Sequence, residues 1–224
     1  MSQRFLVVIL NGPPHSGKDT IISRLMQATT PYMILNHKHI MGWHEKMVMP
    51  LKDMVCGLFN LSGYQYETMK DDPILPNHVT PREAIQHLDV HWSRQLFGED
   101  FLGNLLVKEL EHNHRKSRPY EFKDQVNIHF VDAGVEPELH VLRKAYGDRV
   151  KVLHVYREGI SFTDHRTYLS RPDGQVENID GQVDRVVNEV LLYINRWLGE
   201  FNDQVDARDA TGIPEEGASS QPQS

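Results

Sequence analysis

The residues best suited to chemistry lie near the start of the sequence, in the segment Gly12-Pro-Pro-His-Ser-Gly17-Lys18. The spacing G-x-x-x-x-G-K is typical of a phosphate-binding loop, because its glycines let backbone N–H groups face an anion and its lysine reaches the outer phosphates. A plain Gly/Pro turn is the alternative, but six apolar residues precede the loop and a helical pattern follows it. We therefore predict a nucleotide phosphate site. Its expected residues are Gly12, His15, Ser16, Gly17, Lys18, Asp19 and Thr20.

Two residues of this segment compete to bind Mg²⁺, which phosphoryl transfer from ATP needs. Asp19 stands where a Ser or Thr usually supplies the metal ligand, and Thr20 follows it. A carboxylate in the first helical turn can instead hold a metal-bound water or simply favour the helix dipole. Asp132, at the end of an expected buried strand, is a further acid that could hold the water shell of Mg²⁺. The alternative for Asp132 is a cap on the next helix.

Arginines further along the chain could neutralise charge on a transferred phosphoryl group, since guanidinium groups match phosphate geometry. Arg157 follows an expected strand, which would place it rigidly, and Arg166 and Arg171 lie in a polar segment at 158–181 that could cover the site. A solvated surface position is the alternative for each. The candidate catalytic residues are Lys18, Asp132, Arg157 and Arg166.

A second polar group lies on one expected helix. Arg82, Gln86 and Arg94 are separated by four and eight residues, so the three can share one face. Such a face could hold a second phosphate and contact the edge of a base. Ordinary exposed helix charges are the alternative. The histidines show no zinc-ligand spacing.

The elements that would position these residues alternate between strands and helices. Strands are expected at 5–10, 32–35, 126–131 and 150–156. Helices are expected at about 18–27, at 38–60 with a break or restart at Pro50, at 81–97 with Thr80 as its cap, from Phe101 into the charged run at 111–118, at 136–146 and at 182–201. Residues 64–80 are turn-rich. The alternation predicts an α/β fold with a parallel sheet, whose carboxyl edge would gather the loop, Asp132 and Arg157.

Composition narrows the class of protein. The chain has 224 residues, a net charge of −7 and 13 scattered histidines, which disfavours a stable nucleic-acid complex but leaves DNA open as a substrate. The single cysteine, Cys56, suits a reducing cytoplasm, and no segment resembles a membrane span or a signal peptide. We expect a cytoplasmic protein without a membrane partner, one domain over 1–201, and a disordered acidic tail over 202–224. Dimerisation is left open.

Several short motifs resemble those of the bacteriophage deoxynucleoside monophosphate kinases, in order and in spacing, over roughly residues 4–200. The matching segments are SGKDT at 16–20, MPLK at 49–52, KDDP at 70–73, TPREAIQ at 80–86, WSR at 92–94, VDAGVEPE at 131–138 and ENIDG at 177–181. SGKDT alone is moderately specific, and its combination with the TPR helix is stronger. The Asp at position 19 is itself typical of that family.

The resemblance implies an ATP-dependent, Mg²⁺-requiring transfer to the 5′-phosphate of a deoxynucleotide. It implies a three-layer P-loop kinase fold with a helical monophosphate-binding insertion at about 38–115 and a lid at about 158–181. Lys18 and its loop would hold ATP. The residues that would serve the monophosphate are Lys52, Lys70, Arg82, Gln86 and Arg94. A phage-encoded enzyme would act in the host cytoplasm.

The sequence also departs from that family in two places. Asp132 is followed by Ala133 and Gly134 where the family has D-x-R, and the segment 165–170 only loosely matches the H-x-S-E expected near the lid. Three alternatives therefore stay open: a kinase of a hydroxymethylated base within phage DNA, a nucleotide-binding protein without catalysis, and a small-metabolite kinase such as one for phosphomevalonate.

Overall fold

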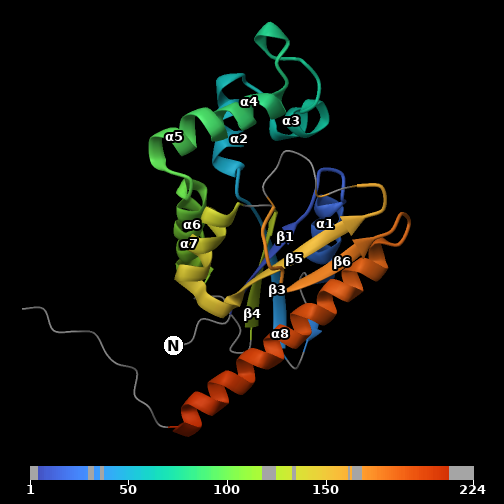
Figure 1. Ribbon diagram of the computed structural model, residues 1–224, viewed down its shortest axis with the longest axis vertical. Helices are drawn as coiled ribbons and strands as arrows, with labels where there is room; N and C mark the ends of the chain where they lie inside the picture. Colours follow the sequence, from blue (N-terminus) through green and yellow to red (C-terminus); the bar gives the residue numbers. More distant parts are fainter. Residues whose placement is uncertain are drawn as a thin grey trace, which may run out of the picture.

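A computed structural model describes residues 5–29, 33–35, 38–117, 125–132, 135–160, 162 and 168–211. Its centre is a sheet with the strand order β2-β3-β4-β1-β5-β6 (Figure 1). The strands are β1 (Phe5–Asn11), β2 (Met33–Leu35), β3 (Lys38–Lys46), β4 (Gln125–Asp132), β5 (Val150–Arg157) and β6 (Gly174–Asn178). All neighbours pair in parallel except β2, which is antiparallel to β3 at one edge. The expected parallel sheet is confirmed.

Strand β1 is buried on both sides because helices cover both faces of the sheet. Leu6, Val8 and Leu10 face a core shared with α1 (Lys18–Thr29) and α8 (Val183–Thr211). Val7 and Ile9 face the opposite core, shared with α6 (Phe101–Ser117) and α7 (Glu136–Tyr146). This alternation along a continuous apolar strand is typical of the middle strand in a three-layer α/β fold, so the predicted fold class is confirmed.

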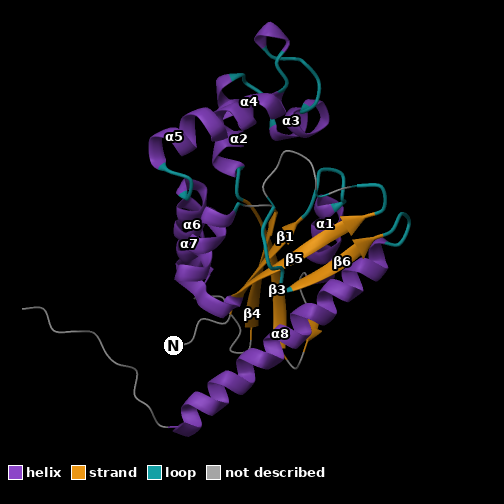
Figure 2. Cartoon of the chain, viewed as in Figure 1, coloured by secondary structure: helices purple, strands orange, loops and turns teal. Residues whose placement is uncertain are grey.

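Apart from the short helix η4 (Gly147–Arg149), which leads into β5, the remaining helices form a group at the end of the sheet where the parallel strands finish (Figure 2). We call the segment 49–97 the insertion. Its helices are α2 (Met49–Leu58), α3 (Gly63–Met69), η1 (Pro76–His78), α4 (Pro81–Leu88), the π-helical turn η2 (Asp89–Ser93) and α5 (Arg94–Phe97). Thr80 caps α4 as predicted, and its hydroxyl accepts the Glu83 N–H while the Glu83 carboxylate accepts the Thr80 N–H.

The helical prediction for residues 38–46 was wrong, because these residues form β3. Along its length β3 pairs with β4, from His39 beside Gln125 to Lys46 beside Asp132, and this tertiary pairing overrides the local helical period. Gly42 permits the arrangement, since a Cβ atom there would lie 2.2 Å from the Thr29 hydroxyl at the end of α1. The helical insertion therefore begins at Met49, just ahead of Pro50.

Three further expectations need correction. The region 64–80 contains α3, which begins with a capping box formed by Ser62 and Gln65. The segment 158–181 is not all cover, because β6 extends the central sheet within it. Helix α8 continues past the expected end at 201 as far as Thr211, so the segment 202–211 is helical; the rest of the predicted tail lies outside the described residues. Within the described part of the chain, no helix is long and apolar enough to cross a membrane.

Candidate functional site

The predicted phosphate loop connects β1 to α1, and its two glycines are required by their surroundings. A Cβ atom on Gly12 would lie 2.5 Å from the Val155 carbonyl oxygen on β5. Gly17 has a φ of +90°, and a Cβ atom there would lie 2.1 Å from the side-chain nitrogen of Asn178 on β6. The neighbouring strands therefore fix the path of the loop, as a preformed anion site needs.

Lys18 begins α1 and reaches back over the loop. Its ammonium group donates hydrogen bonds to the carbonyl oxygens of Gly12 at 2.6 Å and Pro13 at 2.9 Å, and lies 3.4 Å from the Ser16 hydroxyl. Ser16 is fully buried, and its carbonyl oxygen accepts a hydrogen bond from Asn178 at 2.8 Å. The loop thus holds a positive charge beside its backbone turn, in the position expected of a phosphate-binding lysine.

Arg157 also contacts this loop, although sequence spacing alone could place it only at a strand end. One of its nitrogens donates to the His15 carbonyl oxygen at 2.8 Å, and another lies 2.5 Å from the Asp180 carboxylate. His15 is exposed and has a φ of 62°, in the left-handed region. Arg157 therefore links the phosphate loop to the segment after β6. Arg166 lies outside the described residues.

The acidic candidates gather near the same loop. Asp132 ends β4 beside Leu10 on one side and Lys46 on the other. Burial, with a contribution from the Asp19 charge, raises the pKa of Asp132 to about 6, although the charges of Lys46 and Lys18 oppose the increase. Asp132 does not cap the next helix, whose N-cap residue is Val135. The alternative weighed for Asp132 is therefore excluded.

This arrangement fits Mg²⁺ better than a metal held by protein alone. Asp19 and Thr20 are exposed in the first turn of α1, and Asp19 lies within electrostatic range of the half-buried Asp132. No cluster of three or more metal-ligating side chains occurs among the described residues. Mg²⁺ typically takes one or two protein ligands and completes its shell with water and phosphate oxygens, so a pair of acids beside a phosphate loop is a suitable set.

The insertion brings Arg82 toward the phosphate loop. Arg82 forms a two-point ion pair with Asp71, with distances of 2.5 Å and 3.2 Å. The Asp71 hydrogen bond is the main cause of a raised Arg82 pKa, and the charge of Asp19 adds to it. His15 in turn helps to lower the pKa of Asp71. The insertion and the loop therefore lie within electrostatic range of one another.

Lys52 and Lys70 meet at a carboxylate that sequence spacing did not single out. Glu67 on α3 lies 2.6 Å from Lys52, 3.0 Å from Lys70 and 3.6 Å from Lys46. Although burial opposes the shift, the hydrogen bonds from Lys52 and Lys70 lower the pKa of Glu67 to about 2. The Glu67–Lys70 pair has i,i+3 spacing and could have been found from sequence, whereas the other two pairs depend on the fold.

The structure places Arg94 in different surroundings from Arg82. Arg94 follows the π-helical turn and contacts Asp89 at 2.8 Å, Glu99 at 3.0 Å and the buried Glu138 at 3.5 Å. Burial raises the pKa of Glu138 to about 7, although the Val135 N–H and Arg94 oppose the shift. Gln86 is exposed on α4. A substrate role for Gln86 and Arg94 stays a prediction.

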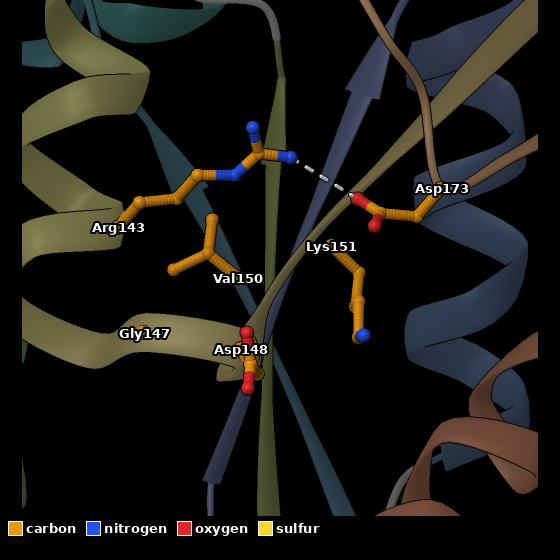
Figure 3. Close-up of a pocket in the computed structure, with 6 residues that line it drawn as sticks. All are labelled: Arg143, Gly147, Asp148, Val150, Lys151 and Asp173. Carbon is orange, nitrogen blue, oxygen red and sulfur yellow. Dashed lines mark hydrogen bonds and ion pairs between the residues drawn. The ribbon is translucent and has the colours of Figure 1, made fainter.

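The protein also has a hollow of about 400 Å³, whose lining residues are drawn in Figure 3. It is lined by Arg143, Gly147, Asp148, Val150, Lys151 and Asp173. Asp173 accepts the Val152 N–H at 2.8 Å and lies 3.3 Å from Arg143. The hollow sits at the start of β5, whereas the phosphate loop and Arg157 are at the other end of the parallel strands.

The glycine loop, its lysine and the parallel sheet together define an α/β protein with a P-loop. No protein-family model matches the chain. A comparison with curated proteins found no match either.

Among solved structures, an unliganded sugar kinase from Janibacter sp. HTCC2649 aligns over 87% of this chain and 95% of its own, with 13% identity and a TM-score of 0.41. A protein described as APE1195 aligns over 89% of this chain and 97% of its own, with 11% identity and a TM-score of 0.40. Likenesses this distant do not bear on substrate or family.

Proposed function

We propose that the protein is a nucleoside monophosphate kinase, which uses ATP and Mg²⁺ to convert a deoxynucleoside 5′-monophosphate, ordinary or modified, into its diphosphate. The observation that carries the proposal is the pairing of two cationic sites. Lys18 lies on a P-loop, and Arg82 lies on an insertion within electrostatic range of Asp19. A transfer between two phosphates needs one such site for the donor and one for the acceptor.

The proposed reaction divides the work between these sites. Lys18 and the loop N–H groups orient the outer phosphates of ATP, and Arg157 adds a cation fixed to the loop at His15. An oxygen of the acceptor phosphate attacks the γ-phosphorus, the bond from that phosphorus to the bridging oxygen breaks, and ADP leaves. Asp19 or Thr20, with Asp132, would hold Mg²⁺, which neutralises charge on the phosphate oxygens when bound. Arg166 is a further proposed cation.

The test is a panel of acceptors. Purified protein is given ATP and Mg²⁺ with each common NMP and dNMP and with modified pyrimidine monophosphates, and ADP formation is measured. We expect ADP only when a monophosphate is added, with a deoxynucleotide preferred over its ribose form. Failure of every acceptor to support turnover would refute the proposal. ATP binding without any product would instead favour a nucleotide-binding protein that does not catalyse.

A second candidate is phosphorylation of a hydroxymethylated base within DNA. It is favoured by the residues after Asp132, which are Ala and Gly where the resembling kinases carry a cation. The net charge of −7 argues against it, because protein cations dominate affinity for a DNA backbone. Transfer of labelled phosphate from ATP into hydroxymethyl-containing DNA, measured beside free nucleotides, separates the two candidates.

A further inference from the structure

Three lysines from three separate elements converge on the single carboxylate of Glu67. Lys46 ends β3, Lys52 lies in the first turns of α2, and Lys70 follows α3. Their ammonium nitrogens lie 3.6 Å, 2.6 Å and 3.0 Å from the Glu67 oxygens. These ion pairs connect β3, α2 and α3. We call Lys46, Lys52, Glu67 and Lys70 the lysine cluster.

The lysine cluster carries more positive than negative charge. Glu67 supplies one negative charge to three lysines, and Lys46 also faces Asp132, whose pKa it lowers. Asp71 also lies within electrostatic range of Lys70 but is paired with Arg82, so the cations still outnumber the carboxylates. Lys52 is only 8% exposed, and its ammonium lies 4.6 Å from the centre of the Tyr66 ring, which holds it in place. Closely spaced, poorly solvated cations repel one another, so an additional negative charge here is stabilising.

The cluster also lies next to the proposed site of transfer. Lys46 pairs with Asp132 across the sheet, and Asp132 in turn is within electrostatic range of Lys18 on the P-loop. Lys46 therefore stands between the P-loop and the insertion. Neither Lys46 nor Glu67 is among the site residues predicted from the sequence.

We propose that Glu67 is an internal substitute for the acceptor's phosphate. In the empty protein its carboxylate holds Lys46, Lys52 and Lys70 in place, and a phosphate monoester dianion displaces it. The dianion offers three terminal oxygens and up to two negative charges, so it can satisfy three ammonium groups better than one carboxylate can. A nucleoside without phosphate cannot replace the carboxylate. Glu67 thereby makes the site selective for monophosphates, with Lys46 as an added binding residue.

Glu67 is suited to this exchange because its side chain is 40% exposed, whereas that of Lys52 is 10% exposed. The carboxylate can swing toward water while the lysine stays fixed. The identity of the acceptor as a nucleotide rests on the function proposed above, but the anion site itself can be tested without any turnover.

The test uses inorganic phosphate as the probe and thermal unfolding as the readout. We compare the wild type with Glu67→Gln, which keeps the shape of the side chain and removes its charge. Removing one competing charge at this distance should lower the phosphate concentration that gives a set rise in unfolding temperature by roughly tenfold. Glu189→Gln, the same change on α8 across the sheet, should leave the phosphate response as in the wild type.

The double variant Lys46→Met/Glu67→Gln separates the cluster from the P-loop, which can also bind phosphate. Loss of Lys46 should cancel most of the gain made by Glu67→Gln if phosphate sits in the cluster. An unchanged or weaker response of Glu67→Gln overturns the proposal, and so does a gain that survives in the double variant.

Steady-state kinetics then keep the two proposals apart. Glu67→Gln should lower the KM for the acceptor monophosphate and leave the KM for ATP unchanged. A tenfold gain in phosphate binding without any ADP formation would support the anion site and refute the kinase. Normal turnover, with neither the phosphate response nor the acceptor KM affected by Glu67→Gln, would support the kinase and refute the role of Glu67.

Discussion

The P-loop and the insertion hold their cations in different ways. Lys18 donates to backbone carbonyl oxygens, and the loop that it covers is confined by β5 and β6 at Gly12 and Gly17. On the insertion, Arg82 and the lysines are held by carboxylates, mainly Asp71 and Glu67. The first site is shaped by steric contact with β5 and β6, and the second by charge pairs that are partly exposed.

This difference suits the two partners of a phosphoryl transfer. A loop fixed by neighbouring strands presents its N–H groups without reorganisation, which favours stabilisation of charge that develops on the donor. In the proposed reaction, the carboxylates that neutralise the insertion would be displaced by the acceptor phosphate, so that side would respond to its ligand. Charge pairs at exposed positions are also weakened by salt, whereas packing of a glycine against a strand is not.

The largest expected effect is on turnover, and it follows from a change at Lys18 on the phosphate loop. Lys18→Met should lower turnover by about 10²–10³-fold, the range for loss of one preorganised charge-stabilising donor, because the outer phosphates of ATP lose their cation. The unfolding temperature should change little, since the lysine is partly exposed. An ADP-release assay and circular dichroism measure the two quantities. Lys108→Met, an exposed lysine on α6, is the matched control. Full turnover by Lys18→Met would show that the loop is not the donor site.

The next effect lies where the insertion meets the core, at Glu138. Its pKa is raised to about 7 in the folded protein, above the ordinary value of 4.5, so the native state binds the proton more tightly than the unfolded state does. Stability from this group is complete below pH 4.5 and is lost as the pH rises through 7. Glu138→Gln should match the wild type near pH 4.5 and exceed its stability by about 2–3 kcal/mol at pH 8.

Urea unfolding of both proteins at several pH values measures this difference. Because Glu138→Gln and the wild type share every other titrating group, the subtraction isolates one carboxyl. If the difference in free energy of unfolding between the two proteins shrinks from pH 4.5 to pH 8, the Glu138 carboxyl does not resist ionisation and the prediction fails.

The third effect is on stability and concerns Gly17 in the phosphate loop. Gly17→Ala should destabilise the protein by about 1–3 kcal/mol, because its φ of +90° is strained for alanine and its methyl group would meet Asn178. Gly57→Ala is the matched control, since nothing lies within 4 Å of a Cβ atom at Gly57, inside α2. That change should raise stability by about 0.5–1 kcal/mol through backbone entropy. Equal effects in urea unfolding would mean that the loop is not sterically confined.

The phosphate loop, which steric contacts fix in place, is also the part of the site that the sequence predicted best. Gly12, Gly17 and Lys18 carry their spacing within one short segment, and the flanking strand and helix appeared as expected. The Thr80 cap and α7 were likewise local signals. By contrast, β3 was missed because its pairing with β4 and the close approach at Gly42 are tertiary.

On the insertion, the sequence predicted only the cations of the candidate site. The sequence offered Arg82, Lys52 and Lys70 as candidates, and their role stays a prediction. It did not indicate their carboxylate partners, because Lys46 and Lys52 reach Glu67 only after β3, α2 and α3 have packed together. Glu138 was part of a motif, yet its burial against Arg94 spans 44 residues of sequence. Local patterns identify which groups carry charge, and the fold decides which of them neutralise one another.

The smallest expected effect on stability tests the insertion directly. Arg82→Met should cost at most about 1 kcal/mol, the usual limit for an ion pair between exposed side chains, because Asp71 is then released to water. It should raise the KM for the acceptor severalfold and leave the KM for ATP near its wild-type value. In the wild type, added salt should raise the acceptor KM more steeply than the ATP KM, since Arg82 and Asp71 on the insertion form an exposed ion pair. If Arg82→Met instead raised the KM for ATP, Arg82 would belong with Lys18 on the donor side, and the division between a rigid donor site and a responsive acceptor site would fail.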